Sequence, residues 1–269
     1  MIDLQLYVGA YETIEPVQGF VGNETFRVRT AEETYYYKSG PGLVAEARAC
    51  TLAAEAGIPA PEVVAVGTHE TGEYLIQRAA DGAPTDPSDT TALASAGKAL
   101  LKLHQVQGDA FGRLSGPLRT TWADHLLQEV KSLHHLVTAG LLPQSHHHQL
   151  INLVHAEASA LEPEHPALLH GDLHPRHLYS TTGTLTAIID WGDALYGDPL
   201  YDLARFSIAG PTSALLTAYG LTLTPDLHRT FALYRALWSA LACQAELQAH
   251  GDWFQPHLDR IAADLTYLS

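Results

Sequence analysis

One stretch, residues 168–202, constrains the fold more than any other part of the chain. It reads LLHGDLHPRHLYSTTGTLTAIIDWGDALYGDPLYD. Its pattern predicts an irregular loop, a short strand, a turn near Gly183 and an apolar strand. Such a hairpin brings the start of its first strand close to the end of its second. We therefore expect His177 and Asp190 to come within a few residues of facing each other, with Asp172 in the loop just before them.

The residue types at this spot favour phosphoryl transfer. A nucleotide–magnesium complex needs an oxygen ligand for the metal and a carboxylate that accepts a hydroxyl proton. We assign Asp172 to the base and Asp190 to the metal anchor. Asp172 and His177 also have the D-x-x-x-x-N spacing of a kinase catalytic loop, with histidine in place of asparagine. Lys38 is the candidate lysine that would complete the set.

Two other interpretations of the stretch stay open. His170, His174 and His177 could bind zinc, with Asp172 or Asp190 as the fourth ligand. An i, i+4 histidine pair requires a helix, and the glycine and proline within this segment favour irregular backbone instead. The second alternative is a polar buried turn that has no activity.

The first third of the chain predicts a small antiparallel sheet. Residues 4–37 alternate apolar and polar side chains and are rich in β-branched and aromatic types. Gly19, Gly22 and Asn23 fall between two of the expected strands, where a loop could approach phosphates closely. An ordinary hairpin turn that requires positive φ at glycine would account for the same residues.

A strand that ends in Lys38 precedes a helical pattern that contains Glu46. A strand lysine facing a helix carboxylate holds an ammonium group against nucleotide phosphates in kinase-like folds, although both side chains could simply be solvated. Two further strands follow, and residues 79–89 form a connector rich in Gly, Pro and Asp. We expect this connector to be a hinge and adenine to meet the backbone near Gln77 and Ala79.

The remainder of the chain predicts helices. Thr224 and Pro225 have the types expected at the N-cap and first position of a long helix. The histidines at 134–135 and 146–148 lack a known metal-binding pattern, and we expect them to be solvated or to cap helices. The other expected helices cover residues 88–106, 121–139, 145–161, 200–209, 212–219 and 253–268.

Composition narrows the class of protein. The chain has 269 residues, 46% of them hydrophobic and 17% charged, which is typical of a globular protein with a sizeable core. A formal net charge of −15 disfavours nucleic acid or anionic membranes as partners and slightly favours a cationic acceptor. No long apolar run or signal peptide is visible, so we expect a cytoplasmic location. Cys50 and Cys243 are expected to be reduced and buried.

The motifs LLHGDLHPRHLY and AIIDWGDALYGDPLYDLARF together resemble the signature of the aminoglycoside phosphotransferase, or phosphotransferase-enzyme, family. The resemblance covers nearly the whole chain, because Asn23, Lys38 and Glu46 also fall where the family has counterparts. It implies an α+β, bilobal, protein-kinase-like fold. Residues 1–80 would form a nucleotide-binding N-lobe, a small antiparallel sheet with one helix. Residues 81–269 would form a mainly helical C-lobe with the catalytic loop and acceptor pocket.

The resemblance also implies residue roles. Lys38 would bind the α- and β-phosphates of ATP or GTP, and Glu46 would hold it. Asp172 would be the catalytic base and Asp190 a Mg²⁺ ligand. Asp198 and Asp202 are structural in the family.

His177 departs from the family pattern, which has asparagine as the second magnesium ligand. Because Mg²⁺ prefers oxygen donors and imidazole suits transition metals, the substitution allows a single Mg²⁺, a preference for Mn²⁺, or a silent protein. The leading expectation is transfer of the γ-phosphate to a hydroxyl of a small molecule, with a cationic, aminoglycoside-like acceptor favoured. The alternative is a weak or silent nucleotide-binding pseudokinase with a regulatory role.

Overall fold

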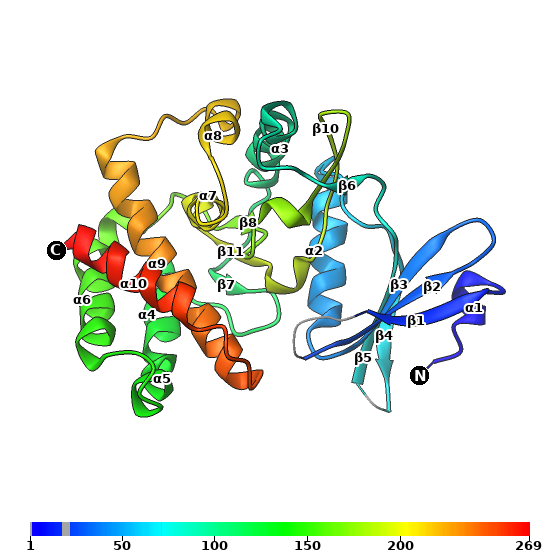
Figure 1. Cartoon of the computed structure of the whole chain (residues 1–269), viewed down its shortest axis with the longest axis horizontal. Helices are drawn as coiled ribbons and strands as arrows, with labels where there is room; N and C mark the ends of the chain where they lie inside the picture. The colour runs from blue at the N-terminus through cyan, green and yellow to red at the C-terminus, as the bar shows by residue number, and fades with distance from the viewer. Residues whose placement is uncertain (1, 18–21, 71) are drawn as a thin grey trace.

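A computed structural model of the protein describes residues 2–17, 22–70 and 72–269. Figure 1 shows a sheet formed by the first third of the chain beside a mainly helical region formed by the rest. The strands are β1 (Thr13–Val17), β2 (Glu24–Arg29), β3 (Thr34–Gly40), β4 (Val63–His69), β5 (Gly72–Arg78), β6 (Ala83–Pro84), β7 (Gly112–Arg113), β8 (Ala167–Leu169), β9 (Leu178–Thr181), β10 (Thr184–Ile188) and β11 (Leu195–Gly197). The helices are α1 (Gln5–Val8), α2 (Leu43–Glu55), α3 (Thr90–Leu103), α4 (Trp122–Ser132), α5 (His134–Thr138), α6 (Gln144–Leu161), α7 (Pro199–Phe206), α8 (Ser213–Tyr219), α9 (Pro225–Gln248) and α10 (Gln255–Leu268), with short 3₁₀ turns η1 (Pro175–His177) and η2 (Trp191–Asp193).

The N-terminal sheet is antiparallel in the order β1-β2-β3-β5-β4. Lys38 pairs in register with Thr25 on β2 and with Leu75 on β5. Helix α2 covers the face of the sheet that looks toward the helical region (Figure 1), and its residues Leu43 and Ala47 pack against Leu75. The sequence order of strand, turn and helix therefore places α2 directly beside the strand that carries Lys38.

The helical region shares its apolar core with α2. The largest cluster of buried side chains runs through the C-terminal helices and includes Ala49, Cys50 and Ala53 of α2. Cys50 and Cys243 are free and buried, as the sequence predicts. This continuous core fixes α2, and with it the N-terminal sheet, against the segment that holds the acidic residues.

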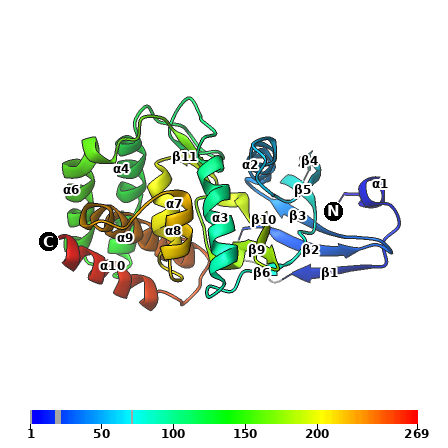
Figure 2. The ribbon, with the colours of Figure 1, turned by 90° about the horizontal axis from the view of Figure 1, so that it is seen from above.

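Strands β9 and β10 form the expected hairpin, in which Thr184 pairs with Thr181. Thr182 and Gly183 connect them with φ values of 48° and 78°, the left-handed conformation of tight hairpin turns. Figure 2 shows α3 between α8 and this hairpin. Helix α3 begins where Asp89 Oδ1 accepts hydrogen bonds from the backbone N–H groups of Thr91 and Ala92, which is the N-cap geometry.

Three local expectations are wrong. Residues 5–8 are helical rather than extended, because Asp3 Oδ1 accepts a hydrogen bond from Gln5 N and Leu4 packs into the core of the sheet. The single helix expected over residues 121–139 is broken at Leu133 into α4 and α5. His147 is buried instead of solvated, and its Nε2 lies 2.9 Å from the carbonyl oxygen of Val130.

Among the described residues, every helix is too short or too polar to cross a membrane.

Candidate active site

The catalytic-type loop between β8 and β9 is held by backbone hydrogen bonds to one buried carboxylate. Asp202, on α7, accepts hydrogen bonds from His170 N at 2.7 Å and from Gly171 N at 2.8 Å. Gly171 has φ of 85°, and a Cβ at this position would collide with the carbonyl oxygen of Asp193. The loop therefore needs glycine here and has a fixed position relative to α7.

The two carboxylates of the GDPLYD motif are structural, as the sequence predicts. Burial would raise the pKa of Asp202, but its hydrogen bond with His104 and the charges around it outweigh burial and lower the pKa. Asp202 therefore stays ionised and keeps accepting the loop N–H groups. Asp198 caps α7 through Leu200 N, and its Oδ2 accepts a hydrogen bond from Tyr234 Oη at 2.6 Å.

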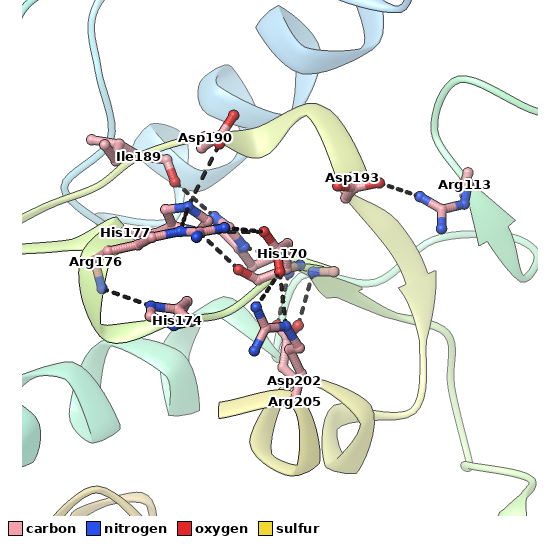
Figure 3. Close-up of polar contacts among 12 residues, drawn as sticks. Arg113, His170, His174, Arg176, His177, Ile189, Asp190, Asp193, Asp202 and Arg205 are labelled. Carbon is pink, nitrogen blue, oxygen red and sulfur yellow. Dashed lines mark hydrogen bonds and ion pairs between the residues drawn. The ribbon is translucent and has the colours of Figure 1, made fainter. Parts of the chain in front are cut away.

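The hairpin brings the three expected side chains together, and Figure 3 shows His177 and Asp190 near each other. His177 Nε2 lies 3.6 Å from Asp190 Oδ2, and His177 Nδ1 lies 3.7 Å from Asp172 Oδ2. Asp190 has φ of 68°, an uncommon conformation for a residue other than glycine that recurs at functional sites. The expectation that Asp172, His177 and Asp190 converge is therefore confirmed.

Lys38 reaches the same place from the sheet. Its Nζ lies 2.6 Å from Glu46 Oε1 on α2 and 3.8 Å from Asp190 Oδ1. Burial would lower the pKa of Lys38, but attraction to Glu46 and Asp190 outweighs burial and raises it. Burial would likewise raise the pKa of Asp190, and Lys38 reverses that shift to a lowered pKa. Lys38 and Asp190 therefore stay charged, whereas burial raises the pKa of Glu46. The two short contacts show that Lys38 is not simply solvated.

His177 is neutral and has one defined tautomer. Its Nδ1 lies 2.8 Å from the carbonyl oxygen of Asp172, an acceptor, so Nδ1 carries the proton. The lone pair at Nε2 then accepts a hydrogen bond from Arg176 Nε at 2.9 Å. Burial lowers the pKa of His177 to about 4, so the ring remains uncharged at neutral pH.

Two arginines at this site were missed by the sequence reasoning. Arg205 Nε and Nη2 lie 2.8 and 2.7 Å from Asp172 Oδ1. Arg176 Nη2 lies 3.6 Å from Asp172 Oδ2, in addition to its hydrogen bond to His177. A signal for Arg205 was present, because an arginine three residues after Asp202 on a short helix shares the face that holds the loop.

Gly22 and Asn23, which directly precede β2, lie near the end of β3. Gly22 has φ of 124°, which requires glycine. The Asn23 side chain packs so closely on Gly40 that a Cβ there would overlap it, and its amide can donate to the carbonyl oxygen of Pro41. Gly19 lies outside the described residues. A phosphate contact from Gly22 or Asn23 stays a prediction.

The two residues expected near adenine are engaged within the N-terminal sheet. Gln77 is buried, and its Nε2 donates a 3.2 Å hydrogen bond to Cys50 Sγ on α2. Ala79 N donates to the carbonyl oxygen of Thr34 at 2.9 Å. A purine at this edge would need other backbone groups than Ala79 N, and the contact stays a prediction.

Asp190 is placed to bind one divalent cation, and His177 could join it only if its Nε2 released the hydrogen bond from Arg176. Metal ligands at about 2.0–2.2 Å from an ion lie roughly 3–4 Å from each other, and the 3.6 Å between Asp190 Oδ2 and His177 Nε2 falls in that range. Among the described residues there is no group of three His, Cys, Asp or Glu side chains placed to hold a metal. The protein offers at most two donors, so phosphate oxygens and water would complete the coordination.

The zinc alternative has less support. His170 Nε2 donates to the carbonyl oxygen of Ile189 at 2.8 Å, and its Nδ1 accepts from Asp172 N at 3.3 Å. Both nitrogens of this ring are therefore used inside the loop.

A narrow cavity of about 10 Å³ lies beside Gly171, Arg113 and Asp193, which is room for a single water molecule at most.

Comparison with known proteins identifies the family of the chain. The phosphotransferase enzyme family matches residues 13–237 of the chain. Hygromycin-B 4-O-kinase of Escherichia coli is 29% identical over an alignment of 187 residues that covers 61% of this chain and 51% of that protein. The match thus spans about half the length of the curated relative.

Solved structures share the fold. Aminoglycoside phosphotransferase APH(4)-Ia aligns with a TM-score of 0.78 at 18% identity, over 99% of this chain and 97% of that one. A ternary complex of a thermostable mutant of the same enzyme with AMP-PNP and hygromycin B aligns with a TM-score of 0.74 at 20% identity, over 98% and 96% of the two chains. The expected α+β, protein-kinase-like fold is confirmed. Because the family match covers most of its length, the chain belongs to the phosphotransferase enzyme family.

Proposed function

We propose that this protein transfers the γ-phosphate of ATP or GTP to a hydroxyl group of a small molecule. The observation that supports this most is the meeting of Asp172, His177, Asp190 and Lys38 between the sheet and the helical region. A carboxylate base, a metal anchor and a lysine are the parts that phosphoryl transfer requires.

In this proposal residues 1–80 bind the nucleotide and residues 81–269 supply the catalytic loop and the acceptor pocket. Lys38, held by Glu46, binds the α- and β-phosphates. Gly22 and Asn23 contact the phosphates, and the segment at Gln77 and Ala79 meets the base. A cytoplasmic location stays a prediction.

The chemistry follows from the charges of these groups. The acceptor hydroxyl oxygen attacks the γ-phosphorus, the bond to the bridging oxygen breaks, and the nucleoside diphosphate leaves. Asp172 accepts the hydroxyl proton, and Lys38 compensates negative charge on the phosphates. Asp190 and His177 would hold a divalent cation, Mg²⁺ or Mn²⁺, which neutralises phosphate charge when bound.

The class of acceptor that we favour is a cationic, aminoglycoside-like compound. The net charge of −15 attracts cations. The relative that matches in sequence is named as a hygromycin-B kinase, and a kanamycin complex of another aminoglycoside phosphotransferase shares the fold at a TM-score of 0.75 and 18% identity. These names guide the choice of compounds to test.

A second candidate function is nucleotide binding without turnover. The hydrogen bond from Arg176 to His177 favours this second function, because a nitrogen whose lone pair already accepts a hydrogen bond is a poorer metal ligand. Turnover decides between the two. Purified protein would be incubated with γ-labelled ATP or GTP, Mg²⁺ or Mn²⁺, and a panel of aminoglycosides, sugars and amino alcohols. A phosphorylated acceptor supports the enzyme, and nucleotide binding without any transfer across the panel supports the pseudokinase.

A further inference from the structure

We infer that Arg205 is the positioning residue that sets the orientation of the Asp172 carboxylate, an inference that rests on the proposed function. Both Nε and Nη2 of Arg205 approach the same oxygen of Asp172, Oδ1, at 2.8 and 2.7 Å. Among the residues that the structure describes, this is the closest approach of a cationic side chain to the proposed base, because Arg176 Nη2 is 3.6 Å away, beyond hydrogen-bonding distance.

The contact distinguishes the two carboxylate oxygens. Oδ1 accepts two charge-assisted hydrogen bonds, so its lone pairs are engaged by Arg205. Oδ2 lies 3.6 Å from Arg176 Nη2 and 3.7 Å from His177 Nδ1, and neither distance is a hydrogen bond. Oδ2 is therefore the oxygen that takes the proton from the hydroxyl group of the acceptor molecule. By holding Oδ1, Arg205 sets the direction in which Oδ2 points.

Arg205 itself has little freedom. Its side chain is 4% exposed, and its guanidinium lies 3.6 Å from the centre of the Trp238 ring on α9, a cation–π contact. On the same helix, Asp202 accepts the backbone N–H groups of His170 and Gly171. Helix α7 thus fixes the loop backbone through one residue and the loop carboxylate through another (Figure 3).

Stability alone is a poor explanation for this pair. A buried ion pair contributes little net stability on average, because desolvation of both charges offsets their attraction. Orientation of a base is a sufficient reason, since a displacement of about 1 Å in a reacting group can cost about 100-fold in rate. The guanidinium suits this task because its planar fork offers two donors in a fixed geometry, whereas an ammonium offers a point charge.

The test compares Arg205→Met and Arg205→Lys with a matched control, Arg235→Met. Arg235 lies on α9 and makes a comparably buried ion pair with Asp264 of α10, with side chains 11% and 7% exposed. It donates hydrogen bonds to Asp264 and to Ser207 at the C-terminal end of α7, and both partners lie outside the catalytic loop. The control therefore removes an equal charge and a similar buried pair without touching Asp172.

Two readings are taken for each variant. The first is kcat and the nucleotide KM with an acceptor that the wild-type protein phosphorylates. We expect Arg205→Met to lower kcat about 100-fold with the nucleotide KM within about threefold of wild type, Arg205→Lys to recover part of kcat, and Arg235→Met to stay within about threefold. The second is a crystal structure of each variant, which needs no turnover. We expect Asp172 to leave its wild-type rotamer in Arg205→Met alone.

The outcomes separate the inference from the proposed function. If Arg205→Met retains the kcat of Arg235→Met, or if its Asp172 keeps the wild-type rotamer, Arg205 does not position the base. If the wild-type protein transfers no phosphate but Asp172 rotates only in Arg205→Met, the orienting contact stands and the proposed function fails.

Discussion

Arg176 Nε donates a 2.9 Å hydrogen bond to His177 Nε2, the one nitrogen of that ring that could bind a metal. The same Nε2 lies 3.6 Å from Asp190 Oδ2. The Arg176 guanidinium and a divalent cation bound at Asp190 would therefore compete for one lone pair. The departure from the family pattern at position 177 thus involves its neighbour Arg176 as well, which the sequence motif alone did not indicate.

The first prediction concerns the metal. Replacing His177 with asparagine substitutes an oxygen donor for imidazole, and the preference for Mg²⁺ over Mn²⁺ should rise. Phosphate transfer measured against each metal, together with Mn²⁺ titration followed by electron paramagnetic resonance, checks the change. An unaltered metal profile would place His177 outside the coordination sphere.

The second prediction separates the guanidinium from the metal. Arg176→Met removes the donor on His177 Nε2 and one positive charge, so Mn²⁺ binding to the nucleotide complex should tighten roughly fivefold. Arg229→Met is the matched control, because Arg229 is also partly exposed and contacts Glu157 instead of the loop. Equal Mn²⁺ affinity in the two variants would show that Arg176 does not compete.

The third prediction concerns the lysine. Glu46→Gln removes the charge that holds Lys38 at 2.6 Å, and we expect the KM for nucleotide to rise roughly tenfold. Glu55→Gln, at the exposed end of the same helix, provides the control. The nucleotide KM of each variant is measured at the same metal concentration. Equal KM values in the two variants would mean that Lys38 binds the nucleotide without the help of Glu46.

The fourth prediction links a buried histidine to acid stability. Burial lowers the pKa of His125 from 6.5 to about 4, and its ring stacks on Trp122 at 5.0 Å. The unfolded chain therefore binds more protons between these values, and the free energy of unfolding must fall as pH drops from about 6.5 toward about 4. His125→Phe should reduce this loss in urea unfolding at several pH values. A variant with the same pH slope would refute the assignment.

Local chemistry explains what the sequence predicted. The hairpin at Gly183 and the start of α9 at Thr224 depend on residues within a few positions of each other, and both form as expected. The meeting of Asp172, His177 and Asp190 also follows from hairpin geometry, because the strands between them set the distance.

Long-range packing explains what the sequence did not predict. Arg205 is 33 residues from Asp172, and only the docking of α7 under the loop brings them together. His147 is buried because α4 and α6 pack against each other, which its histidine-rich surroundings conceal. The break between α4 and α5 at Leu133 is likewise not marked by a glycine or proline in the sequence, and Leu133 itself is fully buried in the core.

The account depends most on Asp172 as the base, and replacing this residue with asparagine tests it most directly. The substitution keeps the shape of the side chain and removes its ability to accept a proton. With an acceptor that the wild-type protein phosphorylates, we predict that transfer falls by about 100- to 10,000-fold. Nucleotide affinity, measured by calorimetry with a non-hydrolysable analogue, should stay within about threefold. Transfer at the wild-type rate by Asp172→Asn would contradict the proposed mechanism.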